Sequence, residues 1–238
     1  MNRWISDGRA RVVAAEDDQF FVPFGWKYDQ SHRAIIWCHG AGGTYAVGPV
    51  EAAIAEVLGC VWINATLGGA RTWGSDASLT HVTTAWTTAK NTFNVKPDKL
   101  VLWGGSMGGL TATLYALANP SNVAAVGCAI PGIDPEYVRL NDPGSPANVN
   151  KDAIEALYGA NEVPAAKQAY SRGADWTSTV PIDIWYSTND TFTPSASITT
   201  FDTAAGAACT LHSLGAAGHN YLDLPTAEAM SYLSAYVR

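Results

Sequence analysis

Apolar residues fall into two alternating patterns along this chain, from about residue 34 onward. Short unbroken apolar runs are typical of parallel strands that are covered on both faces. Between them, apolar residues recur every three or four positions, which is the spacing of one helix face. The predicted strands are residues 34–38, 60–63, 100–103, 123–130, 182–186 and 210–214. The predicted helices are residues 49–58, 82–93, 107–118 and 194–205, and a last one around Met230, Leu233 and Val237.

This alternation predicts an α/β fold with a mostly parallel central sheet and helices on both faces. Two regions depart from it. The first 30 residues are expected to form one or two antiparallel strands at the edge of the sheet. Within residues 134 to about 179, the pattern predicts a loop at 141–146 followed by short helices at 152–158 and 164–170. An insertion at this point would lie above the sheet edge where ligands bind, so it is predicted to be a small cap.

Composition limits the classes of function. With 238 residues, 47% of them apolar, the chain is expected to fold as a single domain, residues 1–238. The net charge of −7, without a basic cluster, argues against nucleic-acid binding. No apolar run reaches the roughly 18 residues of a membrane span. The first nine residues lack the apolar stretch of a secretory signal, so the expected location is cytoplasmic or particle-associated.

The cysteines do not form a metal or disulfide framework in the sequence. None belongs to a C-x-x-C pair, and each lies in or beside an apolar run, which predicts buried free thiols. They are Cys38, Cys60, Cys128 and Cys209.

The most informative motif is Gly104-Gly105-Ser106-Met107-Gly108, which directly follows a predicted strand. It has the form G-x-S-x-G, and a helical pattern comes after it. In this setting the serine occupies a sharp strand-to-helix turn, with its hydroxyl at the carboxyl edge of the sheet. Gly104 and Gly108 are expected to be glycine because the turn leaves no room for a side chain.

Three more features lie where a serine hydrolase needs them. Residues 39–43, His-Gly-Ala-Gly-Gly, follow a strand, and their N–H groups can point at a developing oxyanion. A dinucleotide loop is excluded by spacing, because Tyr45 falls where a small residue is needed. Asp190 follows the strand that ends at Tyr186, and His219 lies between the last strand and the last helix. The order Ser106, Asp190, His219 is the order that this architecture imposes.

Other readings of these residues stay open. Asp190 could cap a turn, and Asp134 is the competing acid. Asp183 lies inside a strand and is a poor candidate. His39 is expected to be structural.

Together these motifs resemble the α/β-hydrolase superfamily, from Ala34 to the carboxyl terminus, and the doubled glycines around Ser106 resemble its esterase, polyester-depolymerase-like and prolyl-oligopeptidase-like branches. The resemblance implies a serine esterase that works through an acyl-enzyme, with Ser106 as nucleophile, His219 as base and Asp190 as its carboxylate. Met107 and Ala41 would supply the oxyanion-hole N–H groups. No metal or other cofactor is implied.

The expected substrate is a small-molecule or polymer-borne ester. Trp26 and Trp73 are candidates to line its pocket, and Arg71 could recognise a carboxylate or pair with Asp76. The alternatives are a peptidase or amidase with the same triad, or a non-catalytic binding protein on a hydrolase scaffold. The sequence leaves the oligomeric state open.

Overall fold

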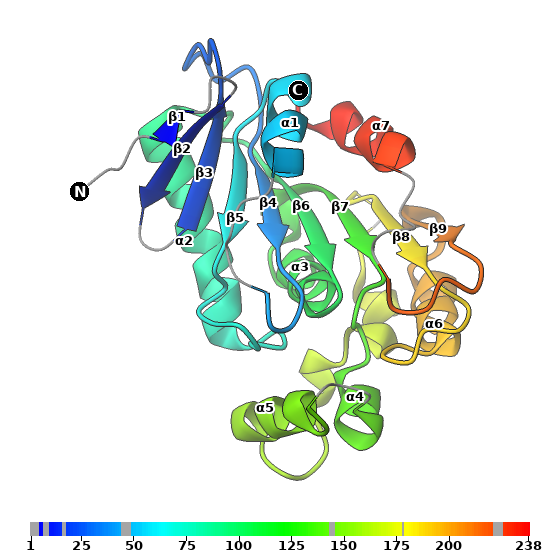
Figure 1. The fold of residues 1–238 in the computed structure, drawn as a ribbon. Helices are drawn as coiled ribbons and strands as arrows, with labels where there is room; N and C mark the ends of the chain where they lie inside the picture. The colour runs from blue at the N-terminus through cyan, green and yellow to red at the C-terminus, as the bar shows by residue number, and fades with distance from the viewer. Residues whose placement is uncertain are drawn as a thin grey trace.

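A computed structural model describes residues 5–6, 10–15, 18–43, 49–142, 146–177, 179–220 and 226–238. Figure 1 shows a central sheet between two layers of helices, with a small helical lobe beyond one edge. The strands are β1 (Ile5–Ser6), β2 (Ala10–Ala15), β3 (Asp18–Pro23), β4 (Ile35–Cys38), β5 (Trp62–Ala65), β6 (Leu100–Gly105), β7 (Val123–Ala129), β8 (Ile182–Tyr186) and β9 (Cys209–Ser213). The α-helices are α1 (Pro49–Leu58), α2 (Asp76–Phe93), α3 (Met107–Ala118), α4 (Pro135–Asn141), α5 (Val149–Tyr158), α6 (Ser195–Ala205) and α7 (Thr226–Tyr236).

The strands form one sheet, in the order β1-β2-β3-β5-β4-β6-β7-β8-β9 within the described residues. From β5 to β9 all pairs are parallel, as predicted. The amino-terminal strands are antiparallel and extend the β5 edge, which was also predicted, but they number three rather than one or two. β5 begins at Trp62 rather than Cys60, because the N–H of Cys60 still donates to the carbonyl of Ala55 at the end of α1.

Alternate residues of each central strand face opposite helical layers. On β6, Leu100 and Leu102 belong to the core that includes residues of α2, α3 and α6, whereas Val101 and Trp103 pack in the core that includes residues of α1 and α7. Both faces of the sheet are therefore buried. This explains why these strands read as unbroken apolar runs in the sequence.

The register of the central strands brings two loops together at the carboxyl edge of the sheet. Cys38, the last residue of β4, pairs with Gly104 near the end of β6. The loop after β4 and the turn after β6 therefore begin side by side. This edge is where ligands bind in open α/β sheets.

The insertion forms the small lobe beyond this edge (Figure 1). α5 begins three residues before the predicted helix, and α4 was not predicted at all. The short helix predicted at 164–170 is formed by two 3₁₀ helices, Ala165–Lys167 and Ala169–Asp175, the second of which extends five residues further. The predicted loop at 141–146 lies partly outside the described residues.

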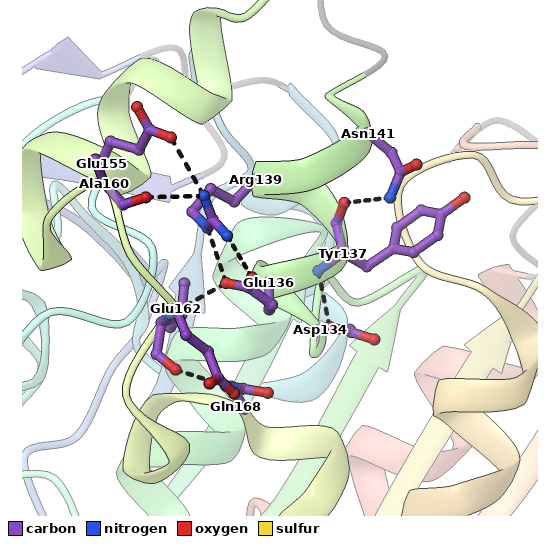
Figure 2. A network of polar contacts seen from close by, with 10 residues as sticks. Asp134, Glu136, Tyr137, Arg139, Asn141, Glu155, Ala160, Glu162 and Gln168 are labelled. Atoms are coloured by element: carbon purple, nitrogen blue, oxygen red, sulfur yellow. Dashed lines mark hydrogen bonds and ion pairs between the residues drawn. The ribbon is translucent and has the colours of Figure 1, made fainter.

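A charged network joins the two α-helices of the insertion (Figure 2). Arg139 of α4 contacts Glu136 at 2.5 Å and Glu155 of α5 at 3.3 Å. Glu136 also accepts a hydrogen bond of 2.9 Å from the N–H of Val163. Because the guanidinium and the Glu136 carboxylate are mostly shielded from solvent, these contacts hold the lobe together more firmly than surface ion pairs would.

The cysteines are buried and free, as predicted. Among the described residues, no helix is long and apolar enough to cross a bilayer.

Candidate active site

Ser106 lies on a strained turn between β6 and α3. Its φ is +50° and its ψ is −121°, a conformation that non-glycine residues adopt only where surrounding packing enforces it. A Cβ atom on Gly104 would lie 2.5 Å from the carbonyl oxygen of Gly108, and one on Gly108 would lie 1.9 Å from the carbonyl oxygen of Cys38. The packing therefore leaves no room for a side chain at either position, as predicted.

The structure brings Ser106, His219 and Asp190 into one hydrogen-bonded chain. Nε2 of His219 lies 2.7 Å from Oγ of Ser106. Nδ1 of the same ring lies 2.8 Å and 3.0 Å from the two carboxylate oxygens of Asp190. With Nδ1 protonated and donating to Asp190, the imidazole can accept the proton of the serine hydroxyl.

The carboxylate of Asp190 is also held in place by contacts other than the one to His219. Its side chain is only 3% exposed, and one of its oxygens accepts hydrogen bonds from the N–H groups of Phe192 at 2.7 Å and Thr193 at 3.1 Å. The ring of Phe192 lies 4.4 Å from the ring of His219, centroid to centroid. Asp190 therefore caps a turn as well as contacting His219, so the two readings of this residue are compatible.

Two further residues hold the histidine loop beside the aspartate loop. The N–H of Gly218 donates to Oγ of Ser187 at 2.8 Å and to Oδ1 of Asn189 at 2.7 Å. Neither residue was singled out in the sequence. Their place just before Asp190, after a buried strand, was the signal that could have found them, because polar side chains there can reach the next loop of a parallel sheet.

The loop at residues 39–43 packs against the start of α3 and is hydrogen-bonded on its other side to the segment that follows β5. The buried ring of His39 contacts the carbonyl oxygens of Gly40 at 2.8 Å and Thr66 at 3.0 Å, which fits its predicted structural role. The N–H of Gly42 donates to the carbonyl of Ala70 at 2.8 Å. By contrast, the N–H of Ala41 makes no hydrogen bond to a backbone carbonyl within the described residues.

Met107 is the first residue of α3, so its N–H has no partner inside the helix. It lies directly after Ser106, at the positive end of the helix dipole. The two N–H groups expected to form an oxyanion hole, those of Met107 and Ala41, thus lie at the adjoining ends of β6 and β4, and neither donates to a backbone carbonyl in the described part of the chain.

The insertion contacts the loop after β5. Tyr158 of α5 donates to the carbonyl of Trp73 at 2.7 Å, and burial raises the pKa of its phenol. Lys167 donates to the carbonyl of Gly74 at 3.1 Å and pairs with Asp76 at 2.6 Å. The hydrogen bond from Lys167 lowers the pKa of the Asp76 carboxyl. These contacts fix the insertion beside the segment that precedes α2.

The structure contradicts both predicted pocket tryptophans. The indole N–H of Trp26 donates to the carbonyl of Phe93 at 2.7 Å. Phe93 ends α2 at the amino edge of the parallel strands, so Trp26 lies at the edge opposite Ser106. Trp73 does lie near Ser106, because both residues lie beside Gly132. A Cβ atom built on Gly132 would lie 3.2 Å from the ring of Trp73 and 3.4 Å from the carbonyl carbon of Ser106. The side chain of Trp73 is fully buried, however, so it supports the turn and exposes no surface to a substrate.

The competing acids are engaged elsewhere. Asp134 caps α4 by accepting from the N–H of Tyr137 at 3.0 Å, and it accepts from the hydroxyl of Ser197 at 2.6 Å. Asp183 contacts His212 at 2.7 Å on the neighbouring strand. Arg71 does not pair with Asp76, which contacts Lys167 instead. That reading of Arg71 was wrong.

Comparison with known proteins adds an independent line of evidence. Residues 80–197 match the family model described as "Putative esterase". No curated protein matches the chain. Among solved structures, an S-formylglutathione hydrolase from Agrobacterium tumefaciens superposes with a TM-score of 0.75 at 18% identity, and 100% of each chain is covered.

Two other solved structures are similar. An acetyl xylan esterase from Paenibacillus sp. R4 gives a TM-score of 0.71 at 13% identity, covering 100% of this chain and 88% of that one. FphF, a fluorophosphonate-binding serine hydrolase of Staphylococcus aureus, gives 0.71 at 11% identity, covering 98% of this chain and 97% of that one. At these identities the structural likeness establishes the shared fold.

Proposed function

We propose that this chain, a carboxylic ester hydrolase of the α/β-hydrolase superfamily, cleaves its substrate through an acyl-enzyme formed on Ser106. The observation that carries the proposal is the hydrogen-bonded chain from Oγ of Ser106 through the ring of His219 to Asp190, with contacts of 2.7 Å and 2.8 Å. A serine hydroxyl is a weak nucleophile near neutral pH, so it needs a base within hydrogen-bond reach.

In the first half of the reaction, Oγ of Ser106 bonds to the ester carbonyl carbon while Nε2 of His219 takes the hydroxyl proton. The tetrahedral intermediate then breaks its bond to the alcohol oxygen, and His219 returns the proton to the leaving alcohol. In the second half, His219 takes a proton from water as the water attacks the acyl carbon. Ser106 leaves with that proton, and the free acid is released.

The remaining residues stabilise charge during these steps. Asp190 holds the ring of His219 in the tautomer that accepts at Nε2 and stabilises the imidazolium once it forms. The N–H groups of Met107 and Ala41 are proposed to bind the oxyanion of the tetrahedral intermediate. Each such donor contributes on the order of 10²-fold or more to the rate.

Labelling with a neutral fluorophosphonate tests the nucleophile. The wild-type protein should take up one label per chain on Ser106, Ser106→Ala should take up none, and His219→Ala should react much more slowly. Ser197→Ala is the matched control, because its serine is equally buried but contacts Asp134. A wild-type protein that stays unlabelled, or a label that persists in Ser106→Ala, would refute the proposal.

A second comparison separates ester from amide chemistry. Short acyl p-nitrophenyl esters should be hydrolysed far faster than aminoacyl p-nitroanilides by the same preparation. Faster cleavage of the anilides would assign the chain to the peptidases or amidases.

A further inference from the structure

Arg71 lies on a short segment that contacts both sides of the proposed oxyanion hole. The residue before it, Ala70, accepts a hydrogen bond of 2.8 Å from the N–H of Gly42. The residue after it, Thr72, directs its N–H at the sulfur of Met107 at 3.1 Å. Arg71 is therefore held between the loop after β4 and the turn that carries Ser106.

The side chain of Arg71 turns toward the oxyanion loop. Its Nη2 lies 3.2 Å from the Cβ position on Gly42, and its Cζ lies 3.7 Å from the same point. Any side chain on Gly42 would therefore meet the guanidinium. The positive charge lies immediately beside the backbone that is proposed to hold the oxyanion.

This guanidinium has no partner in the part of the chain that the structure describes. Its Nε is buried and makes no hydrogen bond, and Asp76, the carboxylate nearest to it in the sequence, pairs with Lys167 instead. On the next residue, the hydroxyl of Thr72 is also buried without a partner. Buried polar groups are nearly always satisfied, and leaving one unpaired is costly. The unsatisfied Nε of Arg71 and hydroxyl of Thr72, on adjacent residues near Ser106, therefore point to a ligand that supplies acceptors.

We propose that Arg71 binds a carboxylate on the ester substrate, so that the preferred substrates are esters that carry a free carboxylate in their acyl or alcohol part. This inference rests on the proposed function. The planar guanidinium offers paired N–H donors that match the two oxygens of a carboxylate. In a chain of net charge −7, an unpaired cation beside the reaction centre also distinguishes an anionic ester from a neutral one.

Two matched pairs of esters test this specificity. Mono-4-nitrophenyl adipate is compared with 4-nitrophenyl hexanoate for the acyl side, and 4-acetoxybenzoate with methyl 4-acetoxybenzoate for the alcohol side, each after subtraction of the uncatalysed rate. The wild-type enzyme should favour the carboxylate-bearing member of at least one pair. In that pair, Arg71→Gln should reduce the ratio of the two kcat/KM values by about 10- to 100-fold, and Arg71→Lys by less. Added salt should weaken the wild-type preference.

Arg172→Gln is the control variant, because Arg172 already pairs with Asp175 at 3.0 Å. It should leave the ratio at the wild-type value. Stoichiometric labelling of Arg71→Gln by a neutral fluorophosphonate shows that its site is intact. Turnover of the neutral esters, and its loss in Ser106→Ala, reports on the proposed function, whereas the ratio reports on Arg71. Preference for the neutral ester in both pairs, or an equal loss on both members in Arg71→Gln, would overturn the inference.

Discussion

At the scale of single residues, the turn at Ser106 shows why the motif contains glycines. The carbonyl oxygens of Cys38 and Gly108 occupy the space that side chains on Gly108 and Gly104 would need. Both obstacles are backbone, so a substitution cannot be accommodated by a rotamer change. The sequence motif is therefore a packing requirement that places the hydroxyl of Ser106 at the sheet edge.

The first prediction concerns Gly108. Gly108→Ala should lower the free energy of unfolding by about 3 kcal/mol, because its Cβ would displace the end of β4 from the start of α3. It should also reduce ester hydrolysis. Urea unfolding and kcat/KM measure both effects. Gly159→Ala is the control: its φ is +91° but no atom lies within 4 Å of the added Cβ, so only strain of about 1 kcal/mol is expected. Equal stability losses in the two variants would contradict this account.

The second prediction separates the two candidate acids. Asp190→Asn should lower kcat by about 10³-fold or more, because the amide favours the wrong tautomer of His219. Asp134→Asn should lose some stability, since Asp134 caps α4 and accepts from Ser197, but should change kcat by no more than a few-fold. Steady-state kinetics on one p-nitrophenyl ester compares them. A larger loss in Asp134→Asn would give the carboxylate role to that residue.

Residue positions could be predicted from the sequence where chain order and strand ends determine them. Ser106, Asp190 and His219 each follow a parallel strand, and such ends meet at one edge of a sheet. Trp26 was misplaced because β3 runs antiparallel to β5, so the segment after β3 emerges at the opposite edge. The pairing direction of an edge strand depends on contacts distant in sequence, which the local pattern does not contain.

At the scale of elements, the insertion shows where pattern reading fails. α4 begins with Asp134 as its cap and Pro135 in its first turn, a recognised start signal, but it is short and carries no long apolar stripe. The helix predicted after α5 is short for a related reason, and its 3₁₀ form and its end at Asp175 were not predicted. Such short elements are stabilised by tertiary contacts, as the network around Arg139 shows (Figure 2).

The third prediction tests that network through pH. The hydrogen bond from Arg139 lowers the pKa of Glu136 below its ordinary 4.5. A lowered folded-state pKa means that the carboxylate stabilises the fold fully above about pH 5 and loses this effect as the pH falls through the folded-state pKa. Glu136→Gln should therefore be less stable than the wild type by about 1–2 kcal/mol at neutral pH, with a difference that shrinks toward about pH 3.

Chemical unfolding across this pH range measures the difference. Glu155→Gln is the control, because Glu155 is more exposed and contacts Arg139 at the longer distance of 3.3 Å, so a smaller effect is expected. A stability difference for Glu136→Gln that stays constant from neutral to acid pH would contradict the assignment.

At the scale of the whole molecule, the parallel sheet could be predicted from the sequence, but the order of its strands could not. Alternating strands and helices predicted the parallel sheet and its two helical layers. They did not predict that β4 lies between β5 and β6, which sets the loop at residues 39–43 beside Ser106. This order results from the crossover directions of the whole chain.

The fourth prediction concerns the buried thiols, which are distributed over both cores of the molecule. Burial raises the pKa of Cys60 and Cys128 to about 12 and raises those of Cys38 and Cys209 as well. A buried, protonated thiol is a poor nucleophile. The native protein should therefore react with Ellman's reagent only as fast as it opens, and all four thiols should react at once in guanidinium. Rapid reaction of the native protein, or fewer than four thiols after unfolding without reductant, would contradict the buried free-thiol assignment.

The most direct test of the central claim is to locate the acyl group during turnover. The enzyme is mixed with excess p-nitrophenyl acetate, quenched with acid within the first turnovers, digested and analysed by peptide mass spectrometry. The account predicts a burst of p-nitrophenol and one acetyl group on the peptide that contains Ser106, with neither in Ser106→Ala. Steady turnover with no burst and no acylated peptide, or an acetyl group on another side chain that is required for activity, would contradict it.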